Sequence, residues 1–348
     1  SRWAVCGRSN SFLNRECYNL FRKIQSFPSL KDNEKYWKKL NFLWGSDFRT
    51  FASDKKIINF YKHAGYMSCA SDASQLPAHL LENKNISFDK DIIETDTLKL
   101  YLNLKKGCTL KKVFFKNVSP EWLFGTISHD LYEDIRFSTD QYSGHFIAQD
   151  IYGKKHTDIS CNVEFNTRIC YEEEKIHLFT KVSPDKEIEL YKSIYIYRKQ
   201  ERIEIEYHFN FFDFQAQYIR MGIITFNPAA FDIESLSYVT HNGGFEEEAY
   251  FVRGTVINQI QNIDNRFTSS HCLGATEGFI KITDKDKEIK ITVDKGYSYL
   301  VPLLHFEEIN NTYYFRIYHS MAETDETSKH LFRGQMKIKF LIDVKRVL

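Results

Sequence analysis

A strict alternation of apolar and polar residues near the middle of the chain constrains its fold more than any other feature. Over residues 202–209 every second side chain is apolar, in the order Arg202, Ile203, Glu204, Ile205, Glu206, Tyr207, His208 and Phe209. Successive side chains of a β-strand point to opposite faces of a sheet, so this pattern predicts a strand with one buried and one exposed face.

Two further strands are predicted on either side of this one. Residues 192–197 are rich in β-branched and aromatic side chains, which favour strands. The polar residues 198–201 are short enough to form a hairpin turn between the two strands. Residues 217–226 supply a third strand, which ends at Asn227-Pro228. Three consecutive antiparallel strands need additional sheet to cover their apolar side.

Short predicted strands fill most of the chain after residue 96 and supply that sheet. Polar turns such as 284–287 and 308–311 separate them. Apart from the three strands above, they cover residues 97–105, 110–115, 146–149, 158–168, 176–182, 279–283, 288–293, 299–307, 312–318 and 335–344. Many strands with frequent turns indicate a mainly β protein, built as a large antiparallel β-sandwich.

The beginning of the chain differs, because its apolar side chains recur at helical spacing. With polar capping residues at their starts, helices are predicted over residues 9–26, 33–44 and 54–63. Helices this short are marginal alone, so we expect a small bundle with Trp37, Leu40 and Trp44 buried in it. The predicted organisation is a helical segment at 1–70, a polar linker at 71–95 and the β-sandwich at 96–348.

The composition argues against several classes of partner. Lysine and arginine total 47 against 46 acidic residues, and a formal charge of +1 argues against nucleic acid, which requires a positive surface. There is no run of 18 apolar residues, so no membrane-spanning helix is expected. The seven cysteines form no CxxC pair, which argues against a structural zinc site and favours free thiols in the cytoplasm. We expect neither a metal nor another cofactor.

Polar residues are densest at 124–145, which is the first candidate for a functional site. Histidines beside carboxylates can act as acid and base, although the spacing here matches no metal motif. Gly144 permits a tight turn that would present neighbouring side chains at a rim of the sandwich. The candidate polar cleft comprises His129, Glu133, Asp134, Asp140, Tyr142 and His145. The alternative is a hydrogen-bonded loop that fastens two strands.

Weaker candidates lie further along the chain. His241 precedes a Gly-Gly pair and three glutamates at 246–248, while His271 and Glu277 form a looser pair. Loops at a sandwich rim often carry binding residues, but an isolated histidine is more often structural than catalytic. Aromatic residues make up 16% of the chain and most simply form the core. The other interpretation is that some of them line a sugar-binding cleft.

Several segments of the chain resemble the C-terminal half of bacterial proteins of glycoside hydrolase family 57. In chain order they are SRWAVCGRSNSFLNRECYNLFRKI, YWKKLNFLWGSDFRTF, LNLKKGCTLKKVFF, GTISHDLYEDIRFSTDQYSGHF and FRIYHSMAETDET. The resemblance implies a catalytic (β/α) barrel, then a small helical segment, then a β-sandwich like those of galactose mutarotase and α-mannosidases. The family's catalytic Glu and Asp belong to the barrel. No βα alternation is visible in this chain, so the resemblance assigns no catalytic residue to it.

Three functions are compatible with these observations. The resemblance implies a non-catalytic region that braces a catalytic barrel and could bind α-glucan or another polysaccharide. The resemblance places that barrel before Ser1, and the sequence opens there without a methionine, so we expect the chain to be a fragment of a longer protein. One alternative is a stand-alone carbohydrate-active enzyme with a mutarotase-like cleft, in which a histidine and a glutamate act as acid and base. The other is an interaction module without a sugar role, and a sandwich fold alone cannot decide among the three.

Overall fold

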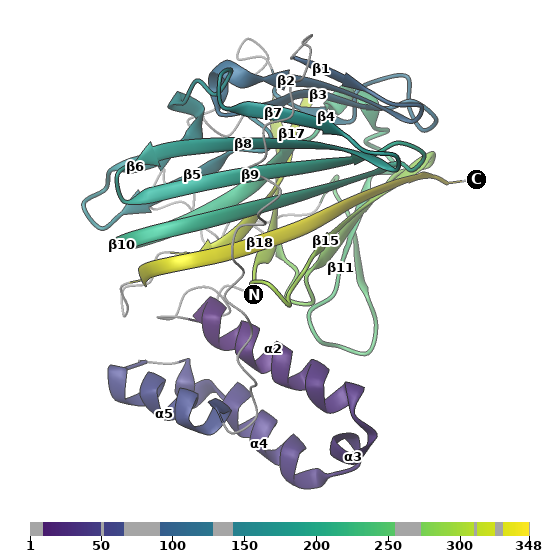
Figure 1. Ribbon diagram of the computed structural model, residues 1–348. Helices are drawn as coiled ribbons and strands as arrows, with labels where there is room; N and C mark the ends of the chain where they lie inside the picture. Colours follow the sequence, from purple (N-terminus) through teal and green to yellow (C-terminus); the bar gives the residue numbers. More distant parts are fainter. Residues whose placement is uncertain are drawn as a thin grey trace.

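The structure is a computed structural model that describes residues 10–49, 52–65, 91–127, 142–254, 273–309, 312–323 and 330–347. Figure 1 shows a small group of helices below a much larger β region. The predicted class is confirmed: the chain is mainly antiparallel β-sheet with a small N-terminal helical segment. No helix within these ranges is long and apolar enough to cross a membrane.

The helical segment has an apolar core of its own. It comprises α2 (Asn10–Ser26), α3 (Pro28–Lys31), α4 (Glu34–Trp44), the 3-10 turn η1 (Ser46–Phe48) and α5 (Asp54–Gly65). Apolar side chains at helical spacing meet in this core, and Leu40 is fully buried there. Trp37 and Trp44, which we expected to be buried, are only partly covered and pack against the cluster from its margin. There the Trp37 indole donates a hydrogen bond to Lys31 O (2.6 Å).

Helix α2 joins the helical segment to the sandwich. The Phe12 ring packs against Phe332, with 5.9 Å between the ring centres. On the same helix, the Tyr18 ring centre lies 5.0 Å from Lys295 Nζ. Since Phe332 and Lys295 both belong to the β region, the helices pack directly on it.

Two antiparallel sheets make up the β region of the described ranges. The smaller has the order β1-β2-β3-β4, from β1 (Ile92–Glu94), β2 (Leu98–Asn103), β3 (Thr109–Phe115) and β4 (Phe124–Gly125). The larger contains β5 (Phe146–Asp150), β6 (Lys155–Thr157), β7 (Thr167–Tyr171), β8 (Lys175–Asp185), β9 (Ile188–Tyr197), β10 (Arg202–Thr225), β11 (Ser237–Thr240), β12 (Glu248–Phe251), β13 (Leu273–Gly274), β14 (Phe279–Thr283), β15 (Lys287–Val293), β16 (Val301–Ile309), β17 (Thr312–Ala322) and β18 (His330–Arg346). Short 3-10 turns connect some of them: η3 (Leu104–Lys106), η6 (Asp158–Ser160) and η7 (Pro228–Ala230).

The strand expected over residues 158–168 is wrong in its first part. Residues 158–160 form the turn η6 instead, and β7 begins only at Thr167. The Thr157 side chain accepts a hydrogen bond from Ile159 N and so caps this turn. A hydrogen bond between a threonine side chain and a backbone N–H two residues ahead competes with the pairing of that backbone in a sheet.

Strand β10 takes part in both halves of the larger sheet. Residues 202–211 pair with β9 on one edge and β18 on the other, whereas residues 216–225 pair with β5 and β17. Bulges between Phe211 and Phe214, and again between Ile219 and Ile224, interrupt the register where the partners change. A bulge bends a strand without ending it. The separate strand expected at 217–226 is therefore wrong, because one 24-residue strand runs through the region.

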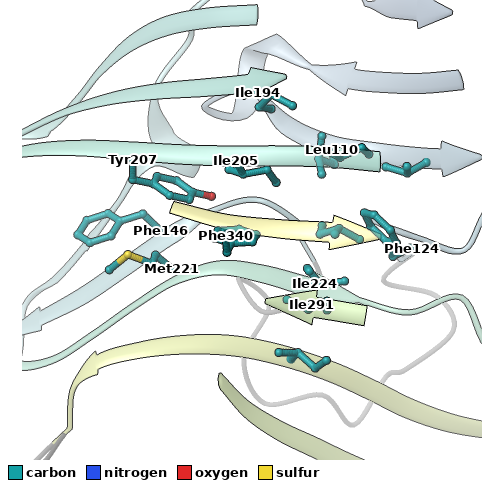
Figure 2. Packing of buried hydrophobic residues seen from close by; sticks show 14 of the residues in the cluster. Leu110, Phe124, Phe146, Ile194, Ile205, Tyr207, Met221, Ile224, Ile291 and Phe340 are labelled. Atoms are coloured by element: carbon teal, nitrogen blue, oxygen red, sulfur yellow. The ribbon is translucent and has the colours of Figure 1, made fainter. Parts of the chain in front are cut away.

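The bend in β10 brings the two halves of the sheet together over one apolar core (Figure 2). Phe146 of β5 packs on Phe209 of β10, and His319 of β17 stacks on Phe340 of β18, with ring centres 5.1 and 4.4 Å apart. Gly222 permits this approach, since a Cβ there would lie 2.4 Å from the Phe340 ring and its φ is +55°. The apolar side of the predicted alternation faces this core, as expected.

Candidate functional site

The motif that ends at His145 lies where the smaller sheet meets β10. The Ser143 hydroxyl donates to Gly125 O (2.5 Å) and accepts from Thr225 N (2.9 Å). The Ser143 carbonyl accepts from Leu110 N at 2.9 Å. One fully buried serine therefore joins β3, β4 and β10. These are the contacts that a fastening loop would make.

Gly144 extends the same junction into the core. Its N–H donates to Ile223 O (2.6 Å), and its carbonyl accepts from Lys192 Nζ (2.9 Å) and from the Tyr207 hydroxyl (3.0 Å). Lys192 also forms an ion pair with Asp158, and both side chains are fully buried. A buried ammonium group requires such oxygen partners, so this cluster fixes the backbone around residue 144.

His145 is completely buried, whereas Tyr142 is half-buried. The Nδ1 atom of His145 lies 2.6 Å from Tyr142 O. Phe146 faces the core and Ile147 belongs to a separate cluster on the other side of the sheet. His145 lies directly before β5, which begins at Phe146.

The remaining residues of the predicted cleft, His129, Glu133, Asp134 and Asp140, lie outside the described residues, and so does His271. His241 and Glu277 are described, and their backbones meet. Glu277 N donates to His241 O (3.0 Å), while His241 Nε2 lies 2.8 Å from Gly244 O. The Glu277 carboxylate pairs with Lys295 Nζ (3.4 Å). Burial lowers the pKa of Lys295, although the Glu277 carboxylate opposes that shift.

A cluster that the sequence did not single out lies on the outer face of β5, the second half of β10, β17 and β16. All of its members are buried except Tyr218, which is half-buried, and we call this set of side chains the arginine face. Its side chains are Ile147, Tyr218, Arg220, Ile223, Val301, Leu303, His305, Tyr314, Arg316, Tyr318 and Ser320. The apolar members form a cluster separate from the main core, as expected for the opposite side of the sheet.

The centre of the arginine face is an ion pair between Arg220 and Glu323. Arg220 donates from Nε to Oε1 (2.8 Å) and from an Nη to Oε2 (2.6 Å), so the pair is bidentate. The guanidinium carbon lies 4.6 and 4.7 Å from the ring centres of Tyr218 and Tyr318. Arg220 is 8% exposed and Glu323 is 2% exposed. Burial disfavours the charged guanidinium, but the Glu323 carboxylate outweighs this and raises the pKa of Arg220.

A second arginine continues the face along β17. Arg316 donates to the Tyr314 hydroxyl (3.3 Å), and its guanidinium lies 5.2 Å from the Tyr314 ring centre. His305 is the register partner of Arg316 on β16, and its ring centre is 5.8 Å from that of Tyr314. Arginines, tyrosine hydroxyls and aromatic rings thus alternate with apolar residues over three neighbouring strands.

These groups define what the arginine face can do chemically. Guanidinium and hydroxyl groups bind oxygen atoms in fixed directions, and tyrosine rings offer flat apolar surfaces. Among the described residues, no group of three or more His, Cys, Asp or Glu side chains is placed to hold a metal ion. One sequence signal could have indicated this face, because Tyr314, Arg316, Tyr318 and Ser320 recur with a period of two.

Comparison with known proteins gives only distant similarities. No family model matches the chain, and no curated protein sequence matches it. Similar solved structures include galactose 1-epimerase from Lactobacillus acidophilus, at 11% identity and a TM-score of 0.44, covering 76% of this chain and 98% of the epimerase. A galactose mutarotase-like protein from Clostridium acetobutylicum gives 10% identity and a TM-score of 0.45 over 74% of this chain and 95% of its own.

An α-mannosidase from Enterococcus faecalis is also similar, at 12% identity and a TM-score of 0.43. The similarity covers 74% of this chain but 29% of the mannosidase. Because these TM-scores lie below 0.5, the similarities support no conclusion about the activity of this chain.

Proposed function

We propose that this chain is a non-catalytic, carbohydrate-binding β-sandwich region of a glycoside hydrolase, of the family 57-like kind that its sequence resembles. In this proposal the arginine face binds α-glucan or another polysaccharide, and the chain braces a catalytic barrel. His145 belongs to the proposed site, together with Tyr142. The observation that carries the proposal is the Arg220–Glu323 pair between the rings of Tyr218 and Tyr318.

This arrangement suits a sugar for two physical reasons. A pyranose ring carries hydroxyl groups around its edge and C–H groups on its faces, so it is recognised by directed polar groups beside flat apolar surfaces. Glu323 holds the Arg220 guanidinium in one orientation through two hydrogen bonds, and a guanidinium held in this way loses little further freedom when it binds. Polar and aromatic side chains alternate along β17, so directed polar groups and flat apolar surfaces recur along that strand.

The test is the affinity of the chain for maltoheptaose, measured by isothermal titration calorimetry. Tyr218 is half-buried, so Tyr218→Ala removes one ring of the site without emptying the main core. We expect a Kd about five- to tenfold weaker, the equivalent of one aromatic contact. The matched control is Tyr152→Ala, which removes a tyrosine that is 88% exposed in the turn between β5 and β6. An unchanged Kd for Tyr218→Ala would contradict this site.

A stand-alone sugar epimerase is the second candidate, because the arginine face contains both a carboxylate, Glu323, and a histidine, His305. A carboxylate and an imidazole can serve as base and acid at the anomeric carbon. Polarimetry of freshly dissolved α-D-galactose would detect this activity as faster mutarotation. If the parent accelerates mutarotation and Glu323→Gln does not, the epimerase replaces the binding region as the better description.

A further inference from the structure

A shallow depression lies on a different face of the molecule, the outer side of β9, the first half of β10 and β18. We call this surface the ladder face. It consists of the outward side chains at 189–197 on β9, 202–210 on β10 and 335–343 on β18. The pocket is lined by Glu189, Tyr191, His208, Phe209, Asn210, Gln335 and Met336.

Strand register explains why the polar lining residues converge. Asn210 is the partner of Glu189 on one side and of Gln335 on the other, so these three side chains form one row across the sheet. His208 pairs in the same way with Tyr191 and lies in the next row on the same face. Neighbouring side chains in such rows are about 5 Å apart, close enough to contact one ligand together.

The charges around the pocket are balanced. The Glu189 carboxylate lies 2.5 Å from Lys181 Nζ and accepts from the Tyr191 hydroxyl (3.1 Å). Behind His208, Glu206 lies 3.1 Å from Lys337 Nζ. Each carboxylate therefore has its own ammonium group. A phosphate or a cation would meet no excess of opposite charge here, so the lining favours a neutral ligand.

The pocket offers hydrogen bonds of both kinds beside aromatic rings. The amides of Asn210 and Gln335 each present donors and an acceptor, and Glu189 presents acceptors. Tyr191 and His208 add two flat rings to the lining. Hydroxyl groups both donate and accept, and the C–H face of a sugar packs on such rings. We propose that this pocket binds one pyranose unit of a neutral oligosaccharide.

This second site goes beyond the proposed function, because it lies on the outer face of the other half of the sheet and shares no residue with the arginine face. A polysaccharide-binding region gains affinity when two separate sites engage one long chain. The ladder face could therefore serve binding even if the arginine face contacts a protein partner.

The experiment titrates the whole chain with maltohexaose, cellohexaose and mannohexaose and compares two pocket variants with the parent. Asn210→Ala and Gln335→Ala each remove one amide from the half-buried or exposed rim of the pocket. We expect each to weaken binding of the preferred hexasaccharide about tenfold, the equivalent of one hydrogen bond. The control is Tyr197→Ala, on the same face of β9 but four rows from the row of Asn210 and Gln335, which should bind like the parent.

The outcomes separate the two sites. If the pocket variants weaken binding and Tyr218→Ala does not, the ladder-face inference stands while the arginine face is ruled out as the sugar site. If only Tyr218→Ala weakens binding, this inference is overturned and the proposed function survives. Failure of the parent to bind any of the three hexasaccharides overturns the inference as well. The melting temperature of each variant shows whether a loss of affinity results from unfolding of the protein.

Discussion

The two halves of β10 belong to one strand but differ in the surroundings of their charged side chains. In the first half, Glu204 and Glu206 point outward and meet Lys339 and Lys337 of β18; the Glu204–Lys339 pair stays partly open to water, whereas Glu206 is buried. In the second half, both sides are buried, and Arg220 points outward into a bidentate pair with Glu323. The Glu204–Lys339 pair of the first half is therefore stabilised partly by solvent, whereas the Arg220–Glu323 pair of the second half depends on protein groups.

The largest expected effect comes from breaking the pair in the second half. Glu323→Ala leaves the Arg220 cation buried without its bidentate partner, and we expect a loss of about 3–5 kcal/mol in unfolding free energy. Urea denaturation followed by circular dichroism measures it. Glu323→Gln keeps the shape and one acceptor, and it should lose clearly less. Equal stability of Glu323→Ala and the parent would remove the contrast between the two halves.

His319, which stacks between the halves, should give the protein a pH-dependent stability. Burial lowers the pKa of His319 from 6.5 to about 4, although hydrogen bonds to Gly222 and Met221 oppose this. The unfolded chain therefore binds the proton first. Stability is full above about pH 6.5 and is lost as the pH falls toward 4, with a loss of about 2 kcal/mol between pH 7 and pH 5.

The control for this prediction is His319→Phe, which keeps a ring against Phe340 but cannot take up a proton. Its stability should be nearly flat between pH 7 and pH 5, apart from the contributions of other histidines. The carboxylates with lowered pKa values, such as Glu189 and Glu206, take up protons at lower pH and therefore contribute little to the stability difference between pH 7 and pH 5. Parallel curves for the parent and the variant would show that His319 is not the group responsible.

The smallest effect is expected from the ladder face. Glu204 lies 2.8 Å from Lys339 Nζ, but this pair is partly exposed, so Glu204→Ala should lose less than about 1 kcal/mol. The difference should shrink further in 1 M NaCl, because salt screens exposed charges. A loss as large as that of Glu323→Ala would mean that the two halves of β10 do not differ in the way described.

The same contrast explains which parts of the fold the sequence predicts. The alternation over residues 202–209 is visible because one side faces the core, and the structure buries that apolar side as predicted. On the polar side Arg202 and Glu204 are partly exposed, whereas Glu206 and His208 are buried. At residues 219–225 both sides are buried, so polar and apolar residues no longer alternate with exposure. The predicted break after Phe209 is therefore a bend in one strand.

The candidate site shows a similar division. The density of polar residues identified the motif around residue 144. It did not show that Ser143 and Gly144 form hydrogen bonds that join neighbouring strands. The sequence also did not show that His145 is fully buried directly before β5. The arginine face escaped notice because its members come from β10, β16 and β17, and no local stretch of sequence contains them all.

The sequence by itself determined the mainly β class, the N-terminal helices and the two-sided character of the first half of β10. Each of these follows from the spacing of apolar residues within a single element. Only the tertiary structure decided that Arg220 meets Glu323, 103 positions later, and that Glu189, Asn210 and Gln335 share one row. The physical reason is that strand register and the bend of β10 place side chains in contact, and neither is encoded by local periodicity.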